Sequence, residues 1–314
     1  MGGRPRERGA STTRGSDMGT ITITGGSGRI ATSIRPLLLA AGHELRLLDV
    51  VAPPTPLADG ETSAIVDTTD VDACTEAFRG SDLVVHLAAH ASERSWEAIQ
   101  AVNNDGAHAV HEAVVRAGVP RILAASSIHA VGFLPATDAA REDVPAPRPD
   151  TFYGLSKVLL EGLGSLYADR HGHVVVSVRI MTAEPEPSAA RSISTWLSAG
   201  DAARLVEAVL HLDEPGHRIV WGVSRNTRRW VSLAAGEAIG YHPEDDAEVF
   251  AHRFPGSGRT RRRPRACCSA RSSRRWSWAP TWADGGPPRR EMSALPDKFM
   301  DAPPRRHAAS IGRS

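Results

Sequence analysis

The sequence predicts an α/β protein built on a doubly wound parallel sheet, followed by a small C-terminal portion. Short apolar and β-branched runs alternate with helical patterns over residues 19–179, a glycine-rich turn follows the first run, and later runs end on small or polar residues. Continuous apolar strands separated by helices are typical of a sheet that is buried on both faces. Ligands bind beyond the carboxyl ends of the strands in such sheets, so we expect the functional residues there.

The first strand, predicted over residues 19–24, runs into the turn Gly25-Gly-Ser-Gly28-Arg-Ile-Ala31 and then into a helical pattern. Gly25 allows a tight turn, Gly28 lets the backbone approach a pyrophosphate, and Ala31 lets the helix pack against the sheet. The helix N-terminus would receive the phosphate charge. A glycine cluster alone also fits a plain loop, but its place between a strand and a helix indicates a Rossmann-like dinucleotide site. The other turn residues that we expect at the cofactor are Ser27, Arg29 and Ile30.

The second and third strands each end on an acidic residue. The second is predicted over residues 44–49, and Asp49 at its end would accept hydrogen bonds from the adenosine ribose hydroxyls. A carboxylate there repels a 2′-phosphate, so the sequence predicts NAD rather than NADP as the cofactor. The third strand is predicted over residues 63–67, and we expect Asp67 to meet the adenine.

Three further strands continue the predicted sheet, over residues 82–89, 120–127 and 174–179. The fourth strand ends where the backbone must lie close to the cofactor, at Leu87, Ala88 and Ala89. Ser127 closes the fifth strand, so its hydroxyl should face the same crevice.

A tyrosine and a lysine follow the fifth strand in the run Tyr153-Gly-Leu-Ser-Lys157. Residues four apart lie on one face of a helix. An ammonium group beside a phenol favours the phenolate, which can take a proton from an alcohol while hydride leaves the same carbon. The pair alone is a weak signal, since a solvated pair on a helix surface has the same spacing.

Taken together, these motifs resemble the extended short-chain dehydrogenase/reductases of the NAD-dependent epimerase/dehydratase family. The matching runs are Thr24-Gly-Gly-Ser-Gly-Arg-Ile-Ala31, His86-Leu-Ala-Ala89, Asn103-Asn-Asp-Gly106, Ala125-Ser-Ser127 and Tyr153-Gly-Leu-Ser-Lys157. The resemblance implies NAD as cofactor and a catalytic set of Ser127, Tyr153 and Lys157. It also implies that Asn103 supports the lysine at the cofactor site.

Within that superfamily the chain looks most like the uronate dehydrogenases. The runs that carry this likeness are Ser126-Ser-Ile-His-Ala-Val-Gly-Phe133, Arg148-Pro-Asp-Thr-Phe-Tyr153, Glu184-Pro-Glu-Pro187, Arg191-Ser-Ile-Ser-Thr-Trp-Leu-Ser198 and Gly222-Val-Ser-Arg-Asn-Thr227. The resemblance implies NAD-dependent oxidation of glucuronate or galacturonate at the anomeric carbon, which gives an aldarolactone. It further implies that Arg191 grips the sugar carboxylate and that His129 and Thr182 lie at the substrate.

Three positions depart from the uronate dehydrogenase pattern. Ile128 stands where asparagine is usual, Met181 stands where glycine is usual, and Ala91 stands where some members have serine. We expect Ser92 to substitute for that serine at the substrate. Two roles have plainer alternatives, because Arg191 could cap a helix or pair with a surface acid and His129 could be a core histidine.

Composition narrows the function classes. The net charge of +1 gives no case for a nucleic-acid partner, and no apolar run approaches the ~20 residues that span a bilayer. The three cysteines form neither a disulfide framework nor a zinc pattern, and hydride transfer requires no metal. We therefore expect a cytoplasmic enzyme for a small sugar acid that forms a homo-oligomer, without membrane, nucleic acid or metal.

The chain divides into four predicted parts. Residues 1–17 form a disordered extension, 18–180 the NAD-binding domain, 181–254 a small substrate-binding portion and 255–314 a basic, proline- and arginine-rich disordered tail. Within 181–254 we expect a helix capped by Asp201 and a strand over 218–223.

Two alternative functions remain open on the sequence alone. One is a nucleotide-sugar epimerase or dehydratase, although residues 181–254 are few for holding a nucleotide diphosphate. The other is a non-catalytic NAD-binding regulatory protein, although such proteins usually lose the tyrosine or the lysine, and both are present here.

Overall fold

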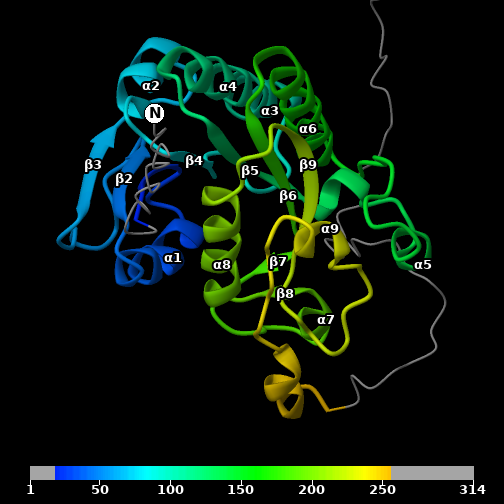
Figure 1. The fold of residues 1–314 in the computed structure, drawn as a ribbon. Helices are drawn as coiled ribbons and strands as arrows, with labels where there is room; N and C mark the ends of the chain where they lie inside the picture. The colour runs from blue at the N-terminus through cyan, green and yellow to red at the C-terminus, as the bar shows by residue number, and fades with distance from the viewer. Residues whose placement is uncertain (1–17, 256–314) are drawn as a thin grey trace, which may run out of the picture. The chain divides into compact units, whose positions relative to one another are not determined.

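The structure, a computed structural model, describes residues 18–255 (Figure 1). The predicted extension over residues 1–17 lies outside the described residues, as does the predicted tail from residue 256 onward. None of the described helices is both long and apolar enough to cross a membrane.

A seven-stranded parallel sheet forms the centre of the fold, in the order β3-β2-β1-β4-β5-β6-β9. The order runs outward in both directions from β1, which confirms the predicted doubly wound sheet. Its strands are β1 (Thr20–Thr24), β2 (Glu44–Asp49), β3 (Glu61–Ile65), β4 (Leu83–His86), β5 (Arg121–Ser127), β6 (Val174–Ile180) and β9 (Gly216–Gly222).

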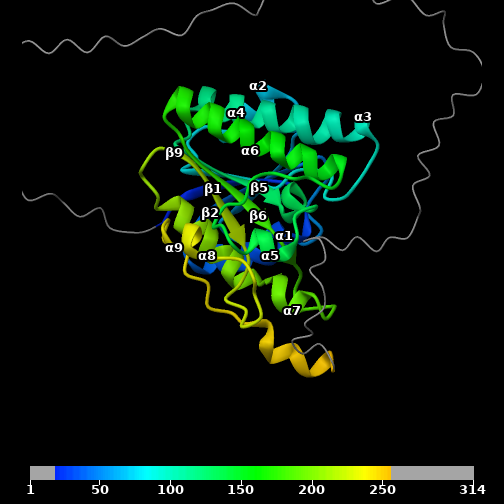
Figure 2. The ribbon, with the colours of Figure 1, turned by 90° about the vertical axis from the view of Figure 1, so that its right-hand side faces the viewer.

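Helices cover both faces of this sheet (Figure 2). On one face α1 packs against α8, and on the other α4 packs between α2 and α6. The bounds of these helices are α1 (Arg29–Ala40), α2 (Val71–Phe78), α4 (Asp105–Ala117), α6 (Phe152–His171) and α8 (Ala199–Leu210). The core lies in two layers, because apolar side chains of the strands point alternately to the two helix layers.

Short elements connect the main ones and lie toward the carboxyl ends of the strands. They include α3 (Trp96–Ile99), a π-helical turn over Gln100–Asn104, a 3₁₀ turn over Ile128–Val131 and α5 (Ala136–Ala139). After β6 come α7 (Ser192–Thr195), α9 (Ala234–Glu237), a 3₁₀ segment over Ala247–Arg253 and a two-stranded parallel sheet of β7 (Thr182–Ala183) and β8 (Trp196–Leu197).

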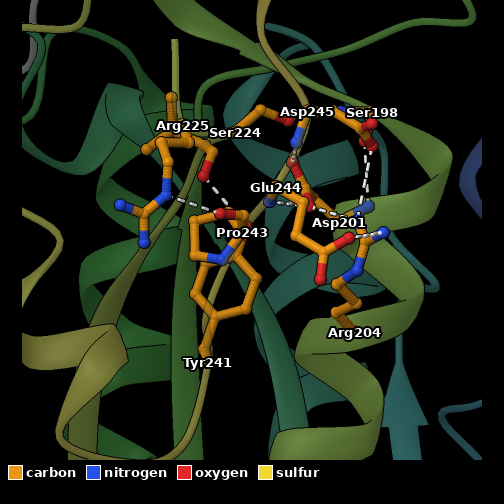
Figure 3. Close-up of polar contacts among 10 residues, drawn as sticks. Ser198, Asp201, Arg204, Ser224, Arg225, Tyr241, Pro243, Glu244 and Asp245 are labelled. Carbon is orange, nitrogen blue, oxygen red and sulfur yellow. Dashed lines mark hydrogen bonds and ion pairs between the residues drawn. The ribbon is translucent and has the colours of Figure 1, made fainter.

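Residues 181–254 extend the main sheet by one strand and one of its helix layers by one helix. Strand β9 pairs with β6 along its whole length, and α8 packs against α1. A network of polar contacts then connects α8 to the turn after β9 and to residues 241–245 (Figure 3).

Two local expectations were wrong. The third strand spans Glu61–Ile65, so Asp67 lies two residues beyond the strand end. Asp201 does not cap its helix: Ser198 is the N-cap and accepts from the backbone N–H of Asp201, which lies in the first turn and is fully buried.

Candidate active site

The glycine turn between β1 and α1 leaves room for a ligand at a helix N-terminus. Gly25 has a positive φ of 70°, and a Cβ atom there would lie 2.8 Å from the backbone nitrogen of Ala88. Gly28 occupies the N-cap of α1, and no side chain caps that end of the helix. The first N–H groups of α1 can therefore bind an anion such as a pyrophosphate.

Asp49 stabilises the shape of this turn. Its carboxylate accepts from the backbone N–H of Ser27, with a nitrogen to Oδ2 distance of 3.0 Å, and from that of Val50, with 2.7 Å to Oδ1. The hydroxyl of Ser27 donates to the carbonyl of Val51. The end of β2 and the glycine turn thus form one rigid wall.

A cavity of about 400 Å³ opens along this wall. The predicted cofactor residues that line it are Gly25, Gly28, Arg29, Ile30, Asp49, Asp67, Leu87, Ala88 and Ala89. Open helix N–H groups, an adjacent arginine and a carboxylate at the end of β2 match the diphosphate and the ribose of NAD. The residues present therefore fit this cofactor.

Asn103 is buried and holds the loop after β4, which lines the cavity, through side-chain hydrogen bonds. Its amide accepts from the backbone N–H of His90 at 2.8 Å and donates to the carbonyl of His90 at 3.1 Å and to the hydroxyl of Ser156 at 3.1 Å. That hydroxyl in turn donates to the carbonyl of Tyr153. Asn103 thus connects the loop after β4 to α6.

A second cavity, of about 420 Å³, continues from the first. The two share the lining residues Arg29, Ile30, Leu87, Ala89 and Ala91. The second brings together the predicted residues Ser127, His129, Tyr153, Lys157, Thr182 and Arg191. Groups from β5, α6, β7 and the segment before α7 thus meet in one space beside the cofactor cavity.

Tyr153 and Lys157 lie one turn apart on α6, with the Lys157 Nζ atom 5.6 Å from the centre of the Tyr153 ring. The lysine is buried, and this burial lowers its pKa from 10.5 to about 8. Ser127 ends β5, is also buried, and its hydroxyl accepts from the backbone N–H of His129 at 3.2 Å. A phenol, an ammonium and a hydroxyl around one space can bind an alcohol oxygen and remove its proton.

Arg191 lies at the opposite side of the second cavity, in the segment before α7. Arg191 is exposed, and within residues 18–255 its guanidinium lies within ion-pair distance of no acidic side chain. Although it occupies the N-cap position of α7, its side chain makes no capping hydrogen bond. Its charge interacts with the carboxylate of Glu184, which lines the same cavity and whose pKa it helps to lower. The exposed guanidinium keeps donors for an anionic group, which it can bind through two parallel hydrogen bonds.

The three departures from the expected pattern have different positions, and Ala91 lines both cavities. Ser92 lines neither cavity, and its exposed hydroxyl accepts from Arg94, so its expected place at the substrate stays a prediction. Ile128 points away from the cavity into an apolar cluster with Trp221. Met181 packs on that cluster and does line the second cavity.

Two carboxylates at the site were not expected from the sequence. Glu93 accepts from the backbone N–H groups of Phe152 and Tyr153, and Asp150 accepts from the imidazole of His129. No local pattern marks either one, since each acts on a residue that is distant in sequence or part of another element. In the described part of the chain, no group of three or more histidine, cysteine or acidic side chains is placed to hold a metal ion.

The glycine turn, the Ser127–Tyr153–Lys157 constellation and the parallel sheet occur together in a known family. The chain matches the sequence model described as "NAD dependent epimerase/dehydratase family" over residues 21–233. The chain belongs to this family.

The chain is similar to several proteins that are named as sugar or sugar-acid dehydrogenases. Uronate dehydrogenase of Pseudomonas syringae pv. tomato is 36% identical over 230 residues, which cover 73% of this chain and 83% of the relative. L-arabinose 1-dehydrogenase (NAD(P)(+)) of Haloferax volcanii is 34% identical and covers 73% of this chain and 98% of the relative. A mutant of the Agrobacterium tumefaciens uronate dehydrogenase, complexed with NAD, superposes with a TM-score of 0.69 at 35% identity, over 75% of this chain and 88% of that one.

Proposed function

We propose that this protein oxidises a uronic acid, glucuronate or galacturonate, at the anomeric carbon with NAD, giving an aldarolactone. The observation that carries the proposal is the second cavity, which holds Ser127, Tyr153 and Lys157 together with the exposed guanidinium of Arg191. The likeness to uronate dehydrogenases over nearly three quarters of the chain supports the same reaction.

The glycine turn, Asp49 and the loop after β4 would hold NAD, whose nicotinamide accepts the hydride. In the second cavity, Tyr153 as phenolate removes the proton from the anomeric hydroxyl, and Ser127 donates a hydrogen bond to the reacting oxygen. The ammonium of Lys157, close to the Tyr153 ring, favours the phenolate by its charge. Removal of hydride and proton from the cyclic sugar leaves a lactone.

Arg191 orients the substrate for this step. A planar guanidinium matches both oxygens of the sugar carboxylate, so it fixes the ring at the end away from the anomeric carbon. Binding there would hold the anomeric hydroxyl toward Tyr153, so that the bound sugar is already oriented for proton and hydride removal.

NADH formation with galacturonate, glucuronate, glucose and UDP-glucose tests the proposed reaction. We expect turnover with one or both uronates and little with the other two. Tyr153→Phe, which removes only the phenolic oxygen, should lower turnover at least about a hundredfold while calorimetry still detects NAD binding. UDP-glucose as the best substrate, or no turnover with any of the four, would contradict the proposal.

The role of Arg191 has its own test. Arg191→Ala should lower kcat/KM for uronates by about 10- to 100-fold, as expected when a charge-assisted hydrogen bond is lost. Turnover of a neutral aldose should change little, because it has no carboxylate to bind. Equal losses on both substrates would contradict a carboxylate-binding role.

Oligomeric state and location are also part of the proposal. We propose a homo-oligomer, which is supported by the exposed apolar side chains of Phe152, Leu155, Leu159 and Leu166 along α6. Sedimentation analysis would test it, with a monomer as the contrary result. We propose a cytoplasmic location, and the free thiol of Cys74 fits a reducing compartment.

A further inference from the structure

A buried carboxylate contacts the histidine at the substrate cavity. The Nδ1 atom of His129 lies 2.9 Å from Oδ1 of Asp150, and the Asp150 side chain is only 6% exposed. The imidazole is one-third exposed, lines the second cavity and packs edge-on against the Tyr153 ring, with 5.5 Å between ring centres. His129 is therefore not a core histidine, since one ring nitrogen is engaged by Asp150 while the ring borders the substrate space.

The surroundings hold Asp150 firmly in this position. The hydroxyl of Thr151 donates to the same Oδ1 atom at 3.1 Å. A methyl group on Gly132 would overlap the Asp150 carboxylate, and one on Gly154 would overlap the carbonyl oxygen of His129. The missing side chains at these two glycines thus allow the carboxylate, the histidine and the start of α6 to pack this closely.

We propose that Asp150 is a positioning residue that fixes the tautomer and the ring orientation of His129. A carboxylate only accepts hydrogen bonds, so the proton of neutral His129 resides on Nδ1, and Nε2 carries a lone pair. Nε2 then accepts from a sugar hydroxyl. This inference rests on the proposed sugar oxidation.

The position of His129 indicates which hydroxyl that is. Ser127 and Tyr153 would hold the reacting oxygen, and His129 directly contacts both residues through its backbone and its ring. The nearest further donor on the substrate is the hydroxyl on the carbon next to the reacting one. The site therefore selects sugar acids that carry this hydroxyl over their 2-deoxy analogues.

Nitrogen NMR of the protein with ¹⁵N-labelled histidine reads the tautomer directly and needs no substrate. His129→Ala identifies the signals. We expect the Nδ1-protonated form in the parent and a shift toward a mixture in Asp150→Ala. An Nε2-protonated His129 in the parent would overturn the proposal whatever the enzyme oxidises.

Kinetics on a uronate and its 2-deoxy analogue test the consequence for the substrate. Asp150→Ala should raise KM for the uronate by about tenfold or more and leave that for the analogue nearly unchanged. Asp150→Asn should restore most of the affinity, because its amide oxygen can still accept from Nδ1. Asp143→Ala, an exposed carboxylate of the same segment, is the matched control and should behave like the parent.

The double variant separates positioning from a general loss of structure. If Asp150 acts through His129, Asp150→Ala should add little to the loss caused by His129→Ala on the uronate. Additive losses, equal losses on both substrates, or an Asp150→Asn variant as poor as Asp150→Ala would each overturn the proposal. A parent without uronate turnover but with the expected tautomer would instead reject only the proposed function.

Discussion

Lys157 acts in the proposed reaction through its charge. It is the only lysine between residues 18 and 255, and its ammonium is buried beside Tyr153. Desolvation disfavours the charged form and lowers the pKa of this group from 10.5 to about 8. The lysine is therefore still charged at neutral pH, where it can favour the Tyr153 phenolate, and it loses that charge within the mildly alkaline range.

Carbon NMR of the cofactor-free protein with labelled lysine should show this titration directly. The chain has two lysines, so Lys157→Met assigns the signal of Lys157 without further work. We expect its midpoint near pH 8. A midpoint near the ordinary lysine value of about 10.4 would show that the ammonium is not desolvated.

The same pKa determines how stability depends on pH. Because the pKa is lower in the folded protein, the unfolded chain binds more protons between about pH 8 and pH 10.5. The free energy of unfolding of the parent, measured relative to Lys157→Met, should therefore rise with pH across this window and stay flat below it. Urea unfolding of both proteins at four pH values measures this difference, and a fall would contradict the expected sign.

Residues whose chemistry is tied to a fixed place in a local motif could be predicted from the sequence. The glycine turn and the Tyr153–Lys157 spacing are examples, because each is a short stretch with one geometric solution. The directions of the Ser92 and Ile128 side chains could not be predicted, since neighbours in sequence need not face the same space. Ser92 accepts a hydrogen bond from Arg94, and Ile128 packs into an apolar cluster. Asp150 and Glu93 acquire their partners only when separate elements meet.

At the scale of elements, Glu93 couples the loop over the cofactor cavity to the catalytic helix. Its two carboxylate oxygens accept from the backbone N–H groups of Phe152 at 3.1 Å and Tyr153 at 2.8 Å, in the first turn of α6. Thr151 accepts from the third free N–H of this turn, that of Gly154. A negative charge at a helix N-terminus also interacts favourably with the helix dipole.

Glu93→Gln should therefore weaken both stability and catalysis. An amide has one acceptor for two N–H groups and no charge, so we expect a loss of about 1 kcal/mol in unfolding free energy. Faster hydrogen exchange at the amides of Phe152 and Tyr153 should accompany it, with kcat reduced more than NAD affinity. Glu97→Gln, an exposed carboxylate on α3, removes the same charge nearby and should change none of these quantities. A stability loss with unchanged exchange at the two amides would contradict the capping role.

Element boundaries were predicted less well than the elements themselves. The third strand is displaced by two residues because its sequence, with exposed side chains at the sheet edge, has little apolar pattern to fix its limits. A helix capped by Asp201 was expected, and the helix that is present spans residues 199–210 and begins after Ser198. Serine and aspartate are both good caps by residue type, so the sequence did not distinguish them. Ser198 is the cap, and the Asp201 carboxylate instead accepts from the backbone N–H groups of Glu244 and Asp245.

For the molecule as a whole, the parallel sheet followed from the alternation of apolar strands and helices. The sequence did not show that residues 181–254 would extend that same sheet through β9. Apolar side chains of α8 and β9 join the main core, and long-range polar contacts then connect α8, the turn after β9 and residues 241–245.

Asp201 is the centre of these contacts (Figure 3). Its carboxylate is fully buried and accepts from the backbone N–H groups of Glu244 at 2.8 Å and Asp245 at 3.1 Å, while Arg204 donates to it at 2.6 Å. Ser198 in turn donates to Asp245. These bonds fix residues 244–245 against the start of α8, next to β8 and the segment that carries Arg191.

Asp201→Asn should therefore be among the more damaging isosteric changes in the chain. The amide nitrogen would face a backbone N–H or Arg204, so a buried donor loses its acceptor, at a cost of about 3 kcal/mol in unfolding free energy. Asp213→Asn is the matched control, because Asp213 pairs with Arg121 through a side chain that is 86% exposed and should cost less than about 1 kcal/mol. Urea unfolding compares the two. Residues 244–245 support the segment before α8, so the KM for uronate should also rise in Asp201→Asn, while NAD affinity stays near that of the parent. Equal losses of unfolding free energy in both variants would show that the buried carboxylate does not hold these segments together.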